Sequence, residues 1–190
     1  TTGGQNVATG ACALFANTTG ANNAAFGFCA SAAGTTANLN TAIGNFALKV
    51  SEAGCKNTAV GYQSMFDATT SECNTALGAY SLTNNTTANF NTAIGTCSMY
   101  TNTTGHSNVA VGYNSLDANT TGDYNVAIGF CSLTTATTAD GNTALGNSAL
   151  KLTTTGADNV AVGRRSLCTN TTGGNNTSVG PYSMTSNTTG

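Results

Sequence analysis

Apolar and polar residues alternate in a short segment that recurs every 17 residues along the whole chain. The unit reads N-[TV]-A-[IVL]-G, with Asn four before the glycine in all eleven units and an apolar residue directly before it in ten. Leu or Met stands four after the glycine in ten units. A unit this short cannot hold the helix pairs of α-solenoids, and its Thr, Val, Ile and Gly disfavour helix. Each unit is therefore predicted to be one coil of a parallel β-solenoid.

Period-two alternation divides this segment between two faces. The Thr or Val three before the glycine and the aliphatic residue one before it share one face, and the Ala between them lies on the other. We expect the aliphatic column to join the Leu or Met column in a narrow core as the coils stack. The glycine is expected at a corner, where a positive φ or a close backbone approach excludes a side chain. The Asn column is expected to form an amide ladder along the axis.

The repeat thus predicts an all-β fold, a single parallel β-solenoid of eleven 17-residue coils that spans residues 1–190 without a linker. Coils stacked at about 4.8 Å make a rod about 50 Å long. Neither end shows a polar or amphipathic cap, and solenoids normally need caps because an open end is an unpaired sheet edge. We expect a segment of a longer fibre, or a subunit whose ends stack on other copies.

Two columns hold only small residues in most coils, the Ala two before the glycine and the Ser or Ala three after it. If the flanking bulky residues point into the coil, these columns point out and form a flat face on which another rod packs. The alternative is tight packing at a corner inside the coil. The candidate self-association face comprises Ala42, Ala59, Ala76, Ala93, Ala110 and Ala127.

The triplet Asn-Thr-Thr recurs at a fixed place, seven residues after the glycine. It is a natural turn signal, because Asn tolerates left-handed backbone and Asx turns. It also matches Asn-x-Ser/Thr, the glycosylation acceptor of exported proteins, and would align attached glycans along one edge. The candidate glycosylation sites are Asn17, Asn85, Asn102, Asn119, Asn170 and Asn187.

The threonines of this triplet form two columns that could also bind ice. Ice-binding faces of solenoids need Thr-x-Thr, so that both hydroxyls of a strand point the same way. Adjacent threonines in a strand point to opposite faces. The sequence therefore disfavours ice binding without excluding it.

Seven cysteines stand in a chain with few other reactive groups. Cys12 and Cys29 share a phase in adjacent coils, within the usual range of a disulfide, and Cys55 and Cys73 are one position out of phase in adjacent coils. These four are the disulfide candidates. The remaining cysteines have no evident partner, and the odd total leaves at least one thiol free or intermolecular. The unassigned cysteines are Cys97, Cys131 and Cys168.

Composition and charge narrow the classes of function. Only 6% of residues are charged and the net charge is -2, which gives no electrostatic reason to expect nucleic acid or an anionic membrane as partner. The single His106 and the absence of a recurring carboxylate pair argue against an enzyme, and no cofactor or catalytic residue is assigned. Asp123 and Asp140 share a phase and are expected to be solvated corner residues, with weak cation binding as the alternative. The cysteine spacings match no zinc motif, so no metal site is assigned.

The unit resembles the head repeat of YadA-like trimeric autotransporter adhesins, and related repeats occur in phage-type tail fibres. The segments that carry the resemblance include NTAIGNFAL from Asn40, NTALGAYSL from Asn74, NVAVGYNSL from Asn108 and NVAIGFCSL from Asn125. The resemblance implies a left-handed parallel β-roll in a trimeric surface fibre that binds host matrix or other cells. The unit here is longer than the family's usual repeat by residues that accompany the NTTG turn.

Together these features predict an extracellular or cell-surface structural protein, a β-solenoid fibre or filament that is adhesive and N-glycosylated along the NTT edge. Its expected partners are copies of itself, cell-surface or matrix ligands, and attached glycans. The alternative is a ligand-binding fibre module, either receptor-binding as in phage fibres or ice-binding through the threonine columns.

Overall fold

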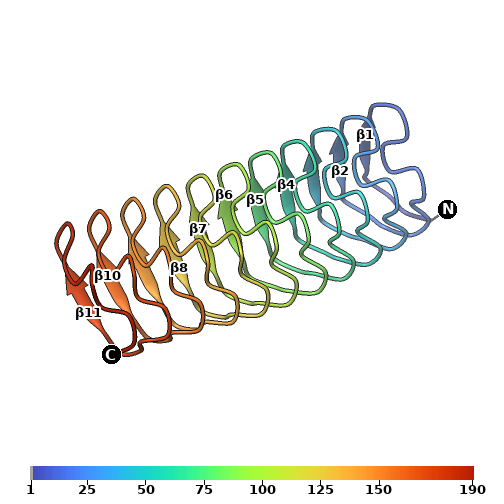
Figure 1. The fold of residues 1–190 in the computed structure, drawn as a ribbon. Coiled ribbons are helices and arrows are strands. Elements are labelled where there is room, and N and C mark those ends of the chain that lie inside the picture. Colours follow the sequence, from blue (N-terminus) through green and yellow to red (C-terminus); the bar gives the residue numbers. More distant parts are fainter. Residues whose placement is uncertain (1) are drawn as a thin grey trace.

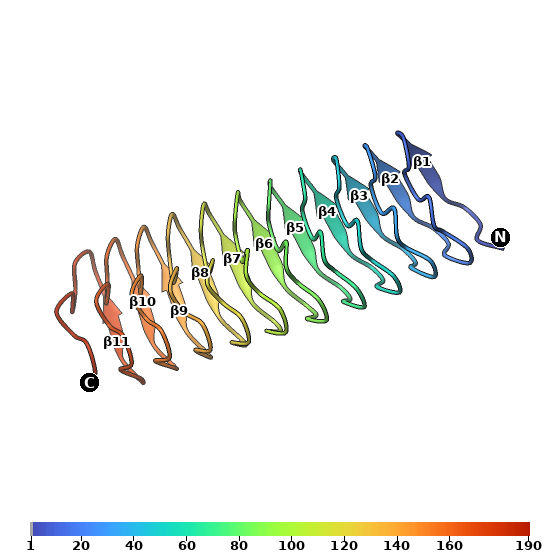
Figure 2. The ribbon, with the colours of Figure 1, turned by 45° about the vertical axis from the view of Figure 1, so that its right-hand side comes forward.

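The computed structural model describes residues 2–190, which form one rod of stacked coils (Figure 1). Each coil contributes one three-residue strand to a single eleven-stranded sheet, in which the strands follow one another in chain order. Neighbouring strands are parallel, and they form one row along the rod, with the chain ends at opposite ends of it (Figure 2). The prediction of an all-β parallel β-solenoid is confirmed.

The strands lie at the predicted N-[TV]-A-[IVL]-G segments, and each pairs with residues 17 positions away, as Ala110 does with Ala127. The strands are Val7–Thr9 (β1), Ala24–Phe26 (β2), Thr41–Ile43 (β3), Thr58–Val60 (β4), Thr75–Leu77 (β5), Thr92–Ile94 (β6), Val109–Val111 (β7), Val126–Ile128 (β8), Thr143–Leu145 (β9), Val160–Val162 (β10) and Thr177–Val179 (β11).

Hydrogen bonds along the axis continue through the turns as well as the strands. The N–H of Leu116, for example, donates to the carbonyl of Ser132 at 3.0 Å, and the N–H of Thr120 donates to that of Thr137 at 2.9 Å. A coil is therefore bound to its neighbour around much of its perimeter. This explains how three-residue strands suffice to hold eleven coils in one register.

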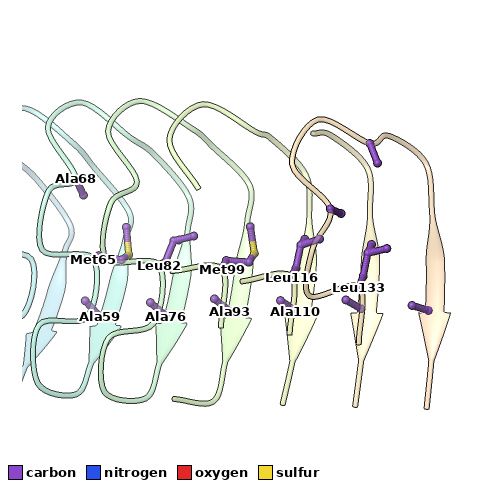
Figure 3. Close-up of a cluster of buried hydrophobic side chains, with 14 of the residues drawn as sticks. Ala59, Met65, Ala68, Ala76, Leu82, Ala93, Met99, Ala110, Leu116 and Leu133 are labelled. Carbon is purple, nitrogen blue, oxygen red and sulfur yellow. The ribbon is translucent and has the colours of Figure 1, made fainter. Parts of the chain in front are cut away.

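The interior contains the middle residues of β2 to β11, which are Ala in nine of these ten strands, and the Leu or Met column. Ala93 and Met99 both have an exposed fraction of 0%. In Figure 3 the strand alanines form one row and the Leu and Met side chains a second row next to it. The predicted Leu and Met core column is confirmed. The prediction that the aliphatic column before the glycine joins the core is wrong, because Leu77 is 47% exposed.

The outward turn of the aliphatic residues has a simple steric cause. A coil of 17 residues closes around a narrow interior, and in ten of the eleven coils one Leu or Met fills much of it. Protein interiors pack at crystal-like density, so the positions that share this space must be small. Ala47 and Ser98, three after the glycine, are buried as well. The small columns are therefore the inner surface of the coil.

The turns depend on left-handed backbone at residues other than glycine. Leu116 has a φ of 51° and Asn114, two residues earlier, a φ of 50°; the equivalent positions recur in the other coils. This region costs an L-residue roughly 1–2 kcal/mol. Burial of the Leu or Met side chain and the axial hydrogen bonds compensate for that cost. No sequence signal marked these positions, since Leu and Met rarely adopt a positive φ.

The repeated glycine is required for two reasons. Gly95 has a φ of 127°, and a Cβ at that position would lie 2.6 Å from the carbonyl oxygen of Gly112 in the next coil. A side chain would thus be both strained and in collision with backbone. The predicted glycine corner is confirmed.

The Asn four before the glycine joins one coil to the next. The Oδ1 of Asn108 accepts the backbone N–H of Asn125 at 2.8 Å, and its Nδ2 donates to the carbonyl of Gly122, across its own coil, at 2.8 Å. The same two bonds recur at Asn40, whose Oδ1 accepts the N–H of Asn57. The predicted amide ladder is present, and it also ties the start of each strand to the NTTG corner.

Candidate interaction surfaces

The outward side of the sheet carries an uncharged surface, one column of which is mostly aliphatic and the other mostly Thr or Val, and the sequence analysis did not anticipate it. We define the outward strip as the first and third residues of all eleven strands. None of these residues is charged, and most third residues are aliphatic. Seven of the eleven third residues are exposed, up to 69% at Val179, and the other four, Val60, Ile94, Val111 and Val162, are partly buried. The signal that could have revealed this strip is the regular Ala between the two positions, since only a small residue suits so narrow an interior.

The candidate self-association face is not on the surface. The side chains of its six alanines have exposed fractions of 0–1% and point into the coil, so no second rod can contact them. The expectation that this column faces outward is therefore wrong, and the alternative of tight packing inside the coil holds. These residues are Ala42, Ala59, Ala76, Ala93, Ala110 and Ala127.

The candidate glycosylation column is also largely internal. Asn85, Asn102, Asn119 and Asn170 each have an exposed fraction of 0%. The Nδ2 of Asn102, the atom to which a glycan would be attached, donates to the carbonyl of Gly105 and to the Oδ1 of Asn85, both at 3.0 Å. A glycan there would replace one of the two Nδ2 hydrogens, so at least one of these bonds would be lost, and the sugar would start from a fully buried atom. The interpretation of this column as an exposed, sugar-bearing edge is wrong for these four.

The remaining two members of the column lie in the terminal coils and are partly exposed. The Nδ2 of Asn17 donates to the carbonyl of Gly20 at 3.0 Å, and the Nδ2 of Asn187 donates to the Oδ1 of Asn170 at 3.3 Å. The same internal bonds therefore occur where neighbouring coils cover the amide less. The turn interpretation accounts for the whole column.

The two threonines of the triplet have different environments. The hydroxyl of Thr103, in the first column, donates to the carbonyl of Thr120 one coil further on at 3.0 Å, and Thr86 and Thr120 repeat the pattern. The second column is exposed in every coil and contains Thr in ten of the eleven, with Ala53 as the exception. Only the second column presents a row of threonines to the surroundings.

The cysteines all have free thiols, so the predicted disulfides are not seen. Desolvation raises the pKa of the Cys29 thiol, and the adjacent Cys12 thiol, which interacts with it by charge and hydrogen bond, raises that pKa further. Desolvation is also the main cause of the raised pKa of Cys55, followed by a hydrogen bond with Glu72 and its negative charge. Raised pKa values keep these thiols protonated and slow to react near neutral pH.

Side chains at the position six before the glycine accept hydrogen bonds from the backbone. The Oδ1 of Asp140 accepts the N–H of Asp123 at 2.8 Å, and the Oδ1 of Asp123 accepts the N–H of His106 at 2.6 Å. The Nδ1 of His106 accepts the N–H of Asn89 at 2.9 Å. Each of these side chains therefore accepts a hydrogen bond from a backbone N–H of the preceding coil. Within residues 2–190, no group of three or more His, Cys, Asp and Glu side chains is placed to hold a metal ion.

Aromatic side chains line the corner that follows the outward strip. The rings of Phe28, Phe46, Tyr62 and Tyr80 contact one another in succession, all edge to face, with centroid distances of 5.2, 6.1 and 5.3 Å. The Nζ of Lys49 lies 5.4 Å from the Phe46 ring centroid. These contacts extend the apolar character of the strip around one corner of coils two to five.

Comparisons with known proteins found no protein-family model, no curated protein and no solved structure that matches this chain. The part of the resemblance to YadA-like repeats that the structure bears out is the architecture, a parallel β-solenoid of about eleven coils. Among residues 2–190 there is no helix long and apolar enough to cross a membrane.

Proposed function

We propose that this chain is the rod of an extracellular or cell-surface fibre, whose task is architecture or adhesion. The observation that carries the proposal is that every coil has the same structure. Eleven coils repeat the same strand, the same glycine corner and the same Asn bridge without an insertion. Such a repeat produces length and straightness, because each added coil extends the rod by one rung and stabilises its neighbour.

The resemblance to YadA-like head repeats supports the surface location and the adhesive role. The partners proposed on this basis are ligands of a host matrix or of a cell surface. Immobilised matrix proteins and whole cells, tested with purified rods, provide a binding assay for that part of the proposal.

The experiment that tests the fibre itself is immunogold electron microscopy on the source cells with an antibody against the purified rod. We expect label along surface filaments, and rods about 50 Å long or longer in negative stain of the purified protein, as the coil spacing requires. Label confined to the cell interior would contradict the proposal.

Ice binding is the second candidate, and the exposed threonine column after the buried Asn favours it. The column presents an exposed Thr in ten coils at the spacing of one coil. The test is the growth rate of ice crystals in the presence of the protein. Slowed growth that is lost in the variant Thr104→Lys with Thr121→Lys supports it, and growth equal to that in a control protein solution rejects it.

A further inference from the structure

We propose that Arg164 and Arg165 form a binding site for an oxyanion, a sulfate or phosphate ester group carried by an anionic polysaccharide. This inference rests on the proposed adhesive function, because it names the chemical class of ligand that the rod contacts at a surface. Both side chains are exposed on the corner that follows strand β10, where a large ligand can reach them.

The corner after β10 brings the two arginine side chains to the same side of the chain. Successive side chains of an extended strand point to opposite faces, but Arg165 has a left-handed backbone with a φ of 55°. The guanidinium carbons of Arg164 and Arg165 lie 5.4 and 6.0 Å from the centroid of one ring, that of Tyr182 in the next coil. The two guanidinium groups are therefore neighbours, no further apart than these two distances together allow.

The Tyr182 ring orients both guanidinium groups without using their hydrogen-bond donors. A cation within about 6 Å of a ring centroid is attracted by the π electrons, and this contact leaves the N–H groups free to bind a ligand. Each guanidinium carries five N–H donors in a planar fork that matches two oxygens of a sulfate or phosphate group. The ring also restricts two long side chains in advance, which reduces the conformational entropy lost when a ligand binds.

The charge of the surrounding coils leaves the two arginines without a nearby carboxylate in the sequence. Residues 147–190 contain Lys151, the two arginines and a single acidic residue, Asp158, so three positive charges and one negative charge give +2. Residues 1–146 contain two lysines and six acidic residues, which give -4. Asp158 precedes β10 and the arginines follow it, so the strand separates them. The repulsion between two neighbouring guanidinium groups is therefore relieved when an anion binds between them.

A third positive charge at this corner favours a ligand that carries several anionic groups. Lys151 is equivalent in the repeat to Lys49, whose Nζ lies 5.4 Å from the ring centroid of Phe46. Phe46 is in turn equivalent to Arg165, so Lys151 lies on the arginine corner one coil earlier. Water and salt weaken exposed contacts with a single ion, whereas a polymer binds through several groups at once. The remaining coils are negative and repel the dense charge of nucleic acid or an anionic bilayer, so a polysaccharide with spaced groups fits this corner.

The first test measures the affinity of the purified rod for dextran sulfate, phosphorylated dextran and unmodified dextran by isothermal titration calorimetry. We expect both anionic polymers to bind, at least about tenfold more weakly when NaCl rises from about 0.05 M to about 0.5 M, because salt screens exposed charges. Unmodified dextran should not bind. The anionic polymer that binds more tightly identifies the ester group. Binding of neither anionic polymer would overturn the inference.

A charge-matched pair of variants tests the site itself. Arg164→Gln with Arg165→Gln removes both guanidinium forks and should bind the preferred polymer at least about tenfold more weakly than wild type. The control Lys49→Gln with Lys56→Gln removes two positive charges from a distant coil and should keep the wild-type affinity within about threefold. A circular dichroism spectrum of each variant checks that the rod is folded. An equal loss in both variants would show attraction by net charge alone and would overturn the site.

Two substitutions of Tyr182 test its part as a positioning residue. Tyr182→Ala leaves the charge unchanged and should weaken binding about two- to fivefold, whereas Tyr182→Phe keeps the ring and should bind as wild type does. Unchanged binding by Tyr182→Ala would overturn the role of the ring. None of these results would affect the proposed fibre function, which depends on where the rods are found in the cell and on their shape.

Discussion

The two asparagine columns of the coil look alike in the sequence but differ in how strictly the residue recurs. The column four before the glycine contains Asn in all eleven coils, whereas the column seven after it also contains Gly34, Ser51, Ala68, Ala136 and Thr153. Both are buried, and both donate from Nδ2 to the same carbonyl: Gly122 accepts from Asn108 at 2.8 Å and from Asn119 at 3.0 Å. The donor bond therefore does not explain the difference.

The difference lies in what the Oδ1 atoms accept. In the first column Oδ1 accepts a backbone N–H of the next coil, a buried group with no other partner. In the second column Asn102 Oδ1 accepts the side-chain Nδ2 of Asn119 at 2.7 Å, a group that disappears when the next coil lacks Asn, and the one backbone N–H accepted there, from Gly122 to Asn119 Oδ1, is longer at 3.2 Å and stays within its own turn. A buried backbone N–H without an acceptor lowers the stability of the fold far more than the loss of a hydrogen bond between two Asn side chains, because both side chains can be replaced together. Recurrence within the repeat thus follows the needs of the backbone.

The largest expected effect is that of Asn108→Ala. The substitution leaves the Asn125 N–H without an acceptor and also removes the bond to Gly122. We expect the free energy of unfolding to fall by about 3 kcal/mol. Urea titration followed by circular dichroism measures it. If Asn108→Ala lowers the free energy of unfolding no more than the second-column variant Asn102→Ala does, the two columns do not differ as described.

A smaller effect is expected for Asn102→Ala in the second column. The Gly105 carbonyl keeps its bond from Asn91 at 2.8 Å, and no backbone group is left unpaired. We expect a loss of about 1 kcal/mol in the same titration. If this variant is as unstable as Asn108→Ala, the natural Ala at positions 68 and 136 must be compensated by some other feature of those coils.

The reverse substitution, Ala136→Asn, should stabilise the rod. Asn119 lies one coil before, so a new Nδ2 at position 136 can donate to its Oδ1 and to the Ala139 carbonyl, as Asn102 and Asn119 do in their coils. We expect a gain of about 0.5–1 kcal/mol. Ala127→Asn is the matched control, because this equally buried strand Ala faces the packed interior and the larger side chain should destabilise the rod. Loss of stability in both variants would contradict the account of the second column.

The smallest effect is expected at Thr104, which belongs to the exposed column beside the second Asn column. Thr104→Ala should change the free energy of unfolding by less than about 0.5 kcal/mol, as surface substitutions usually do. Thr103→Ala is the comparison, because its hydroxyl donates to the Thr120 carbonyl. We expect the loss there to be the greater of the two in parallel urea titrations.

Much of the fold could be predicted from the sequence, because the 17-residue period determines the register of every column at once. The coil count, the parallel strands, the glycine corner, the Leu and Met core and the Asn ladder all follow from it. The alternation within a strand shows that Thr92 and Ile94 share a face, but not which face is inside. That choice depends on interior volume, which becomes clear only when the coil is closed.

The interaction surfaces were harder to predict for the same reason. Once Ile94 turns outward, Ala93 becomes core and the outward strip appears, so one inverted assignment exchanged the two candidate faces. The Asn-Thr-Thr triplet predicts the turn, but Asn102 follows the left-handed Met99, whose carbonyl accepts the Asn102 N–H at 3.3 Å, and that conformation carries no sequence signal. Burial of the glycosylation column was therefore not predictable from the triplet alone.

The central claim is the direction of the strand side chains, because both the core and the outward strip depend on it. The most direct test compares the urea unfolding midpoints of Ala93→Lys and Ile94→Lys. Ile94→Lys should retain the wild-type circular dichroism spectrum and a midpoint close to that of wild type. Ala93→Lys should not fold, because its charge would be buried without a partner. A folded Ala93→Lys protein beside an unfolded Ile94→Lys protein would contradict the account.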